Sequence, residues 1–115
     1  MKNMVNAFKA MADQNRLKIL KMLQCREMCV CEIRTLLEVS QPSASKHLRV
    51  LEKAGLINSY KEGLFVNYRI SRPNENRQIE ELLANLSRWL ETDDDITNIM
   101  ERLPNIHRED ICGRQ

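Results

Sequence analysis

Three cysteines lie close together near the start of the chain, in the segment CREMCVCEI that spans residues 25–33. Cys25, Cys29 and Cys31 are candidates for core packing, for a disulfide or for binding a soft ion. An all-sulfur set with no histidine beside it favours trivalent arsenic or antimony, or soft ions such as cadmium and lead, over magnesium and calcium. A structural zinc site usually shows two close cysteine pairs, whereas the fourth cysteine, Cys112, is isolated near the end.

Length and composition bound the fold class and the compartment. A chain of 115 residues suits one domain, and 4% aromatic residues, three glycines and 30% charged residues favour a helix-rich protein. The sequence has no run of 18 apolar residues and no secretory signal at its start, so we expect a cytoplasmic protein with no membrane partner. In that reducing compartment, clustered cysteines are more often metal ligands or reactive thiols than disulfides.

The charge is distributed unevenly along the chain. Residues 43–72 carry six basic and two acidic residues, a net charge of +4, whereas residues 75–101 carry two basic and eight acidic residues, a net charge of −6. This split suggests that the basic middle faces a polyanion, although a charge split with no partner is the simpler alternative.

Helix signals follow one another through the first half of the chain. MVNAFKAMA has apolar residues at helical spacing, and Asp13 is a suitable N-cap for a second helix, QNRLKILKMLQ. A third short helix is predicted over VCEIRTLLEV, directly after the cysteine segment. Ser40 and Pro42 suit the start of a fourth helix, PSASKHLRVLEKA, which Gly55 should end.

The fourth predicted helix has an apolar face and a polar face. Ala44, Leu48 and Leu51 fall at helical spacing and define the buried face. Small and basic residues lie roughly opposite, namely Ser45, Lys46, Arg49 and Lys53. Two short helices joined by the tight connection VSQP are typical of a helix-turn-helix that enters a major groove, where small hydroxyls allow close approach and cations neutralise phosphate.

A β-hairpin is predicted directly after this helix. LINSYKEGLFVNYRI has two β-rich runs around KEGL, and Val66, Tyr68 and Ile70 alternate as in a half-buried strand. A hairpin in this position forms a wing, whose tip residues Lys61 and Gly63 can reach an adjacent minor groove or the DNA backbone.

One long amphipathic helix is predicted over NENRQIEELLANLSRWLETDDDITNIM. Its apolar face is larger than a domain of this size can cover, so we expect a second copy of the chain to cover it. A two-fold dimer presents two recognition helices to successive major-groove faces, which predicts an inverted-repeat DNA site.

Residues 4–92 resemble the ArsR/SmtB family of metalloregulatory repressors, through the run CVCEIRTLLEVSQPSASKHLRVLEKAGLI followed by KEGLFVNYRI. The resemblance implies a mainly α fold with a small β-hairpin: a homodimeric winged helix-turn-helix over residues 1–100, followed by a tail over residues 101–115. It implies that the dimer represses transcription at an operator until an inducer releases it. The DNA contacts that it implies are Gln41, Ser43, Ser45, Lys46, His47, Arg49, Lys61 and Gly63.

The resemblance also bears on the inducer. Some family members hold zinc-type ions between C-terminal helices with Asp and His ligands, but residues 75–103 contain no histidine. EMCVCEI instead resembles the arsenic site of other members, which implies Cys29 and Cys31 as ligands. Where those members have a third cysteine this chain has Arg34, so Cys25 is the nearest replacement and Cys112 the next. We therefore expect arsenite or antimonite as the inducer of a metalloid-resistance repressor, with no permanently bound cofactor.

The spacing of the cysteine pair suggests how sensing works. Residues i and i+2 of a helix point about 200° apart, so two helical cysteines at that spacing cannot share one small ion. Binding is then expected to distort the first turn of the third helix, which supports the recognition helix. The tail is either disordered or an arm that carries Cys112.

Other function classes remain open at this point. A cadmium or lead sensor uses the same cysteines, and a thiol redox switch would close a disulfide in response to peroxide. A winged-helix regulator whose cysteines no longer sense anything is a further alternative. An enzyme is not expected, because the chain lacks a CxxC motif and a glycine-rich phosphate loop, and its only histidines are His47 and His107.

Overall fold

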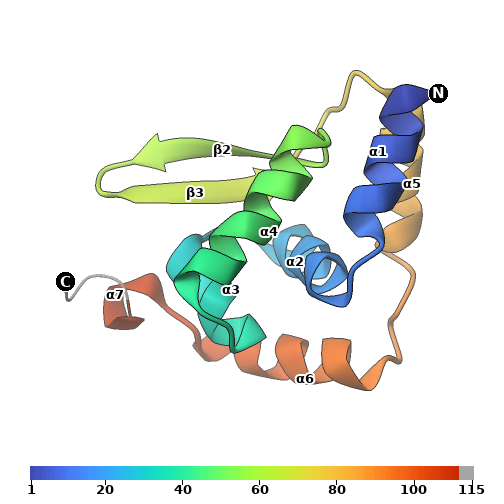
Figure 1. Cartoon of the computed structure of the whole chain (residues 1–115). Coiled ribbons are helices and arrows are strands. Elements are labelled where there is room, and N and C mark those ends of the chain that lie inside the picture. Colours follow the sequence, from blue (N-terminus) through green and yellow to red (C-terminus); the bar gives the residue numbers. More distant parts are fainter. Residues whose placement is uncertain (112–115) are drawn as a thin grey trace.

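The computed structural model describes residues 1–111, which form helices around a small antiparallel sheet (Figure 1). The arrangement confirms the predicted fold class, mainly α with a small β-hairpin. The elements, in chain order, are α1 (Lys2–Met11), α2 (Gln14–Cys25), β1 (Met28–Cys29), α3 (Val30–Leu37), α4 (Gln41–Lys53), β2 (Ile57–Glu62), β3 (Phe65–Ile70), α5 (Arg77–Leu86), α6 (Asp94–Arg102), the 3-10 helix η1 (Leu103–Asn105) and α7 (Arg108–Ile111).

The predicted capping residues begin and end the first helices. The Asp13 carboxylate accepts a hydrogen bond from the Arg16 amide at 3.1 Å, and the Ser40 hydroxyl accepts one from the Ser43 amide at 3.2 Å. Burial raises the pKa of the Asp13 carboxyl. The hydrogen bond from the Arg16 amide and the charge of the Arg16 side chain outweigh this effect of burial and hold the pKa below its ordinary value. Gly55 follows α4 with φ +81°, the left-handed conformation that favours glycine.

The core joins α2, α3 and α4 to the sheet and to the C-terminal helices. Ala44, Leu48 and Leu51 of α4 are fully buried, as the helical spacing predicts. Lys21 of α2 is also buried, and its ammonium donates to the carbonyl oxygens of Leu86 at 3.0 Å and Ser87 at 3.3 Å. This cation therefore satisfies carbonyl groups at the end of α5 and ties that helix to the core.

The sheet has three antiparallel strands in the order β1-β3-β2. The predicted hairpin is confirmed, with β2 and β3 joined at Gly63 and Leu64. The third strand, β1, is only two residues long and pairs Cys29 with Asn67 of β3. The predicted third helix begins at Val30 as expected, but the interpretation of Cys29 and Cys31 as two helical residues is wrong, because the Cys29 backbone is extended and bonded to the sheet.

The burial pattern of β3 also differs from the predicted alternation. Val66 is exposed and Asn67 is buried, so the prediction that Val66 faces inward is wrong. Asn67 tolerates burial because its amide donates to Glu62 at 2.8 Å and its carbonyl oxygen accepts from Arg108 at 3.0 Å.

The prediction of a single long C-terminal helix is also wrong, because the chain forms two helices, α5 and α6, with a break between them. Leu90 lies in the break with φ +66°, and Asp93 caps α6 by accepting from the Ile96 amide at 3.1 Å. A left-handed residue cannot continue a right-handed helix. The acidic run therefore begins a new helix, which passes beneath α3 in Figure 1.

Regular structure continues beyond residue 100, the boundary expected from the sequence. Helix α6 ends at Arg102, and η1 and α7 follow, with Leu103 buried in the core. Cys112 lies outside the described residues. Among residues 1–111, no helix is long and apolar enough to span a membrane.

Candidate functional site

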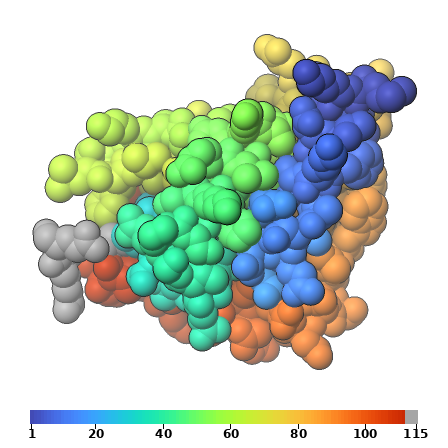
Figure 2. Space-filling view, in the orientation of Figure 1, coloured from blue at the N-terminus to red at the C-terminus, as the bar shows by residue number. Residues whose placement is uncertain are grey.

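The predicted DNA-contacting residues of α4 occupy the part of the helix surface outside its buried stripe. Gln41, Lys46 and Arg49 are exposed, whereas Ser43 and Ser45 are half-buried. The buried stripe of α4 holds the helix against α2 and α3, so the polar side is left at the surface. Figure 2 shows α4 in green on the same face as the hairpin of β2 and β3. This face combines an accessible helix with a projecting wing, as DNA major-groove recognition requires.

His47 has a packing contact as well as its position on α4. Its Nδ1 lies 3.3 Å from Nη1 of Arg16, and the Arg16 Nε donates to the Ala10 carbonyl at 2.6 Å. Arg16 thereby joins the end of α1 to α4. The His47 side chain is half-buried, so part of it stays accessible. Contact between this accessible part and DNA stays a prediction.

The wing carries the other predicted DNA contacts. Lys61 and Gly63 are exposed near its tip. Gly63 has φ +60°, a left-handed backbone conformation that glycine adopts easily because it has no side chain. Arg69 stacks on the Tyr60 ring, with its guanidinium carbon 4.6 Å from the ring centroid. The wing therefore presents basic side chains on a hydrogen-bonded hairpin.

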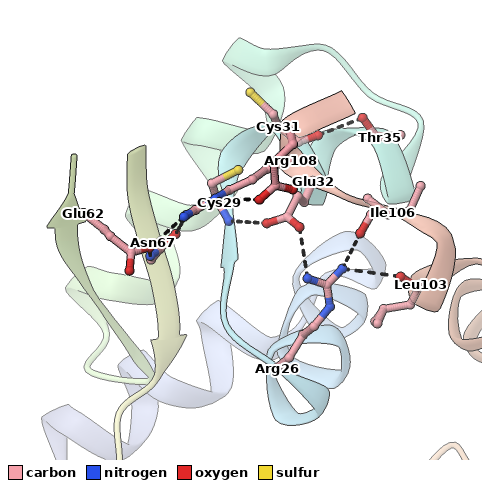
Figure 3. Close-up of polar contacts among 11 residues, drawn as sticks. Arg26, Cys29, Cys31, Glu32, Thr35, Glu62, Asn67, Leu103, Ile106 and Arg108 are labelled. Atoms are coloured by element: carbon pink, nitrogen blue, oxygen red, sulfur yellow. Dashed lines mark hydrogen bonds and ion pairs between the residues drawn. The ribbon is translucent and has the colours of Figure 1, made fainter. Parts of the chain in front are cut away.

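The cysteines of the candidate thiol site occupy three different environments. Cys29 is buried in β1 and immediately precedes α3, while Cys31 is half-buried in the first turn of α3 (Figure 3). Cys25 ends α2, is exposed, and its thiol lies 3.3 Å from the Met100 sulfur. Within residues 1–111, no group of three or more His, Cys, Asp or Glu side chains is arranged to hold a metal ion.

Burial affects the chemistry of Cys29. Its thiol has a raised pKa because the buried environment disfavours the thiolate. The thiolate is the form that binds a soft ion. Binding at Cys29 therefore requires a local rearrangement that brings its sulfur out of the core.

A buried carboxylate ties the first turn of α3 to its surroundings. Glu32 accepts from the Cys29 amide at 3.0 Å and from the Arg26 guanidinium at 3.0 Å (Figure 3). Arg26 also donates to the carbonyl oxygens of Ile106 at 2.7 Å and Leu103 at 3.4 Å. The spacing of Glu32 three residues after Cys29 is a capping-box signal that the sequence analysis missed.

The other end of α3 is held in a similar way. Arg102 of α6 donates to the Leu36 carbonyl oxygen at 2.7 Å, near the C-terminus of α3. Arginines therefore hold both ends of the helix that begins at the cysteine pair. A change in the cysteine segment must work against these contacts.

The tip end of the wing contacts α7. Arg108 donates to Glu62 at 2.8 Å and to Asn67 at 3.0 Å, and its guanidinium lies over the Phe65 ring, 4.2 Å from the centroid. The hydrogen bonds from Asn67 and Arg108 hold the pKa of the Glu62 carboxyl below its usual value. No local sequence pattern indicates Arg108, because its partners lie some forty residues earlier in the chain.

Comparisons with known proteins agree with this geometry. Residues 13–59 match the family model described as "Bacterial regulatory protein, arsR family". The arsenical resistance operon repressor of Escherichia coli strain K12 is 43% identical over 68 residues, which cover 58% of each protein. The cadmium resistance regulator CadC of Listeria innocua is 42% identical over 64 residues, 55% of this chain and 54% of CadC. The chain thus spans little more than half the length of these relatives.

Two solved structures share the fold over most of the chain. Reduced HlyU from Vibrio cholerae is 37% identical, with a TM-score of 0.65 over 76% of this chain and 87% of HlyU. A homodimeric winged helix-turn-helix DNA-binding domain from Mycobacterium bovis, described as a possible ArsR-family regulator, is 27% identical, with a TM-score of 0.66 over 81% of this chain and 82% of that domain.

Proposed function

The chain belongs to the arsR family of bacterial regulatory proteins, and from this premise we propose that it is a transcriptional repressor that trivalent arsenic or antimony releases from its operator. The observation that carries the proposal is the position of Cys29 and Cys31 at the start of α3, the helix that packs against α4. In the reduced protein, one short segment thus supplies cysteine thiols for the inducer and contacts the element that reads DNA. Nothing in this role requires catalysis, and the family consists of regulators rather than enzymes.

DNA recognition is assigned to α4 and the wing. The α4 contacts to bases and phosphates are Gln41, Ser43, Ser45, Lys46, His47 and Arg49. Lys61 and Gly63 at the wing tip are placed to reach the neighbouring groove or backbone. The charge of residues 43–72 supports binding to a polyanion.

A second copy of the chain completes the DNA-binding unit. Val5 and Phe8 of α1 and Trp89 and Leu90 after α5 are large apolar residues left exposed, and α1 lies beside α5. Exposed apolar groups of this size are typical of an interface. The solved homodimeric domain from Mycobacterium bovis supports the same assembly. A two-fold dimer implies an operator with an inverted repeat.

The proposed inducer site acts on α3 through Cys29. Because this residue is only 2% exposed, an ion shared with Cys31 must draw its sulfur outward. That movement strains the bond from the Cys29 amide to Glu32 and the β1 pairing with Asn67 of β3. It therefore reaches α4 through α3 and the wing through the sheet. A coupling of about 1–3 kcal/mol between inducer and DNA would lower operator affinity about 5- to 150-fold.

The third ligand is assigned to Cys25, with Cys112 as the alternative. Cys25 is exposed and ends α2, three residues before β1, so a moderate shift of the connecting segment can bring it toward the pair. Three thiolates suit the trigonal-pyramidal preference of trivalent arsenic, which needs the sulfurs in their reduced form.

A cadmium-responsive regulator is the second candidate. The 42% identity to CadC of Listeria innocua favours it, because that relative is a cadmium resistance regulator. Cadmium and arsenite both bind thiolates, so the same fold can respond to either inducer. The number and arrangement of the thiolate ligands then decide which inducer binds.

The proposal is tested by operator binding of the fully reduced protein. A duplex selected by the protein from a random-sequence pool is labelled, and fluorescence anisotropy is measured while arsenite or cadmium is added to wild type and to Cys25→Ser, Cys29→Ser, Cys31→Ser and Cys112→Ser. We expect arsenite to release wild type but not the Cys29 and Cys31 variants. Whichever of the Cys25 and Cys112 variants also stays bound identifies the third ligand.

Three results would contradict parts of this proposal. Release by cadmium alone would favour the second candidate. Release of both the Cys29 and Cys31 variants would remove the thiol site from the mechanism. A wild-type protein that prefers no duplex would refute DNA-binding regulation itself.

A further inference from the structure

We propose that a basic groove between α1 and α4 binds phosphates of the DNA backbone beside the segment that α4 reads. This inference rests on the proposed function, since it extends the DNA interface beyond the helix-turn-helix and the wing. The groove has a volume of about 550 Å³ and is lined by residues from α1, α2 and α4. Four of its lining residues are basic: Lys2, Lys9, Arg16 and Lys53.

All charged residues that line the groove are basic. None of its lining residues is acidic, and Lys2, Lys9 and Lys53 are exposed. Within residues 1–111, none of these three lysines lies within ion-pair distance of a carboxylate, whereas Lys18 and Lys21 have such partners. An uncompensated cluster of cations attracts a polyanion.

Arg16 has a different role from the lysines. Its guanidinium donates to the carbonyl oxygens of Ala10 at 2.6 Å and Lys9 at 3.4 Å, so it holds the end of α1 against α2. Its contact with His47 connects the same corner to α4. Arg16 therefore fixes the position of the groove and adds positive charge at its base.

The basic side of α1 borders its exposed apolar side. Lys2, Asn6 and Lys9 follow a helical stripe, and Phe8 lies about a third of a turn from it at 3.6 residues per turn, while Val5 adjoins the two lysines. Lys2 and Lys9 line the groove toward α4, whereas Val5 and Phe8 do not line it. Figure 2 shows α1 in dark blue beside α4 in green, on the face that also carries the wing.

The spacing of the lysines favours a strand of phosphates over a single small anion. Lys2 and Lys9 are seven residues apart, about 10 Å along the helix, and Lys53 faces them from the end of α4. Successive phosphates of a backbone give each of these side chains a separate partner, so the ammonium groups need not converge on one point. Contacts of this kind raise affinity for any sequence and carry no base preference.

The test measures DNA affinity against salt for the double variant Lys2→Gln and Lys9→Gln. The charge-matched control is Lys18→Gln with Arg88→Gln, which lie outside the groove. Anisotropy is recorded with the duplex selected by the wild type and with a scrambled duplex. Each lost phosphate contact should reduce the slope of log affinity against log salt by about 0.9, so we expect a decrease of about 2 per protomer. The ratio of selected to scrambled affinity should stay unchanged, as should the slope of the control.

Three outcomes are distinguishable. A wild-type slope in the double variant, or an equal loss in the control, overturns the groove while leaving the proposed function intact. A changed ratio of selected to scrambled affinity contradicts pure backbone contact. A wild type with no preference for the selected duplex refutes the proposed function, and the groove with it. Lys53→Gln, on the opposite wall, should lower the slope by about 0.9 per protomer.

Discussion

Replacing Arg26 by methionine should lower the free energy of unfolding by about 2–3 kcal/mol. Glu32 is almost fully buried, with 4% of its side chain exposed, and Arg26 is the charged partner that it contacts at 3.0 Å. Removing one member of a buried ion pair typically costs about 3–5 kcal/mol, because the remaining charge is left without a partner. The lower figure applies here because 37% of the Arg26 side chain is exposed, so water screens part of the interaction.

Urea unfolding measures this loss. Methionine keeps the apolar stem of Arg26 but none of its donors, so the carbonyl oxygens of Leu103 and Ile106 lose their contacts as well. Arg34→Met is the matched control, since Arg34 is exposed on α3, the helix that carries Glu32, and it should change stability by less than about 0.5 kcal/mol. Equal effects of the two substitutions would show that Arg26 does not compensate the buried carboxylate.

Leu48→Ala should destabilise the protein by about 2–5 kcal/mol, the range for a leucine removed from a packed core. Leu48 is fully buried on α4, at the centre of the stripe that holds this helix against its neighbours. The cavity also loosens the support of the polar side of α4, so operator affinity of the folded variant should decrease.

Leu64→Ala is the control for this substitution. Leu64 is fully exposed at the wing turn, so its removal should change the free energy of unfolding by less than about 0.5 kcal/mol. Thermal unfolding compares the stability of the two variants. Operator anisotropy is then measured at a temperature below the unfolding midpoint of both. A Leu48→Ala protein as stable as wild type would contradict the assignment of α4 packing.

Local signals in the sequence predicted much of the fold. Asp13, Ser40 and Gly55 act at helix ends through residues one to three positions away, so their effects can be read without the tertiary structure. The apolar spacing of α4 and the turn at Gly63 are equally local. The helix-turn-helix and the wing followed from these features.

Long-range contacts account for the elements that sequence reasoning missed. β1 exists because Cys29 pairs with Asn67, nearly forty residues away, and two residues carry no strand signal of their own. Asn67 is buried because Arg108 reaches it from α7. At the break after α5, Lys21 reaches from α2 and satisfies the carbonyl groups at the end of that helix. Tertiary contacts of this kind override local propensity.

The candidate site was predicted by residue type but not by conformation. Soft-ion chemistry follows from the spacing of Cys29 and Cys31 alone, whereas the extended backbone and burial of Cys29 come from the sheet. Cys29 and Cys31 are therefore not two helical residues, as their spacing had suggested. Distortion of α3 is instead expected because Cys29 must leave a buried position whose amide is bonded to Glu32.

The central claim is that inducer binding opens the start of α3. Hydrogen exchange of the Cys29 amide, whose proton is bonded to Glu32, measures this opening directly in the reduced protein. We predict that arsenite accelerates exchange at Cys29 and along its pairing with β3, while the amides of Leu20 and Met22 in buried α2 keep their protection. Unchanged exchange at Cys29 in protein that has bound arsenite and released DNA would contradict the account.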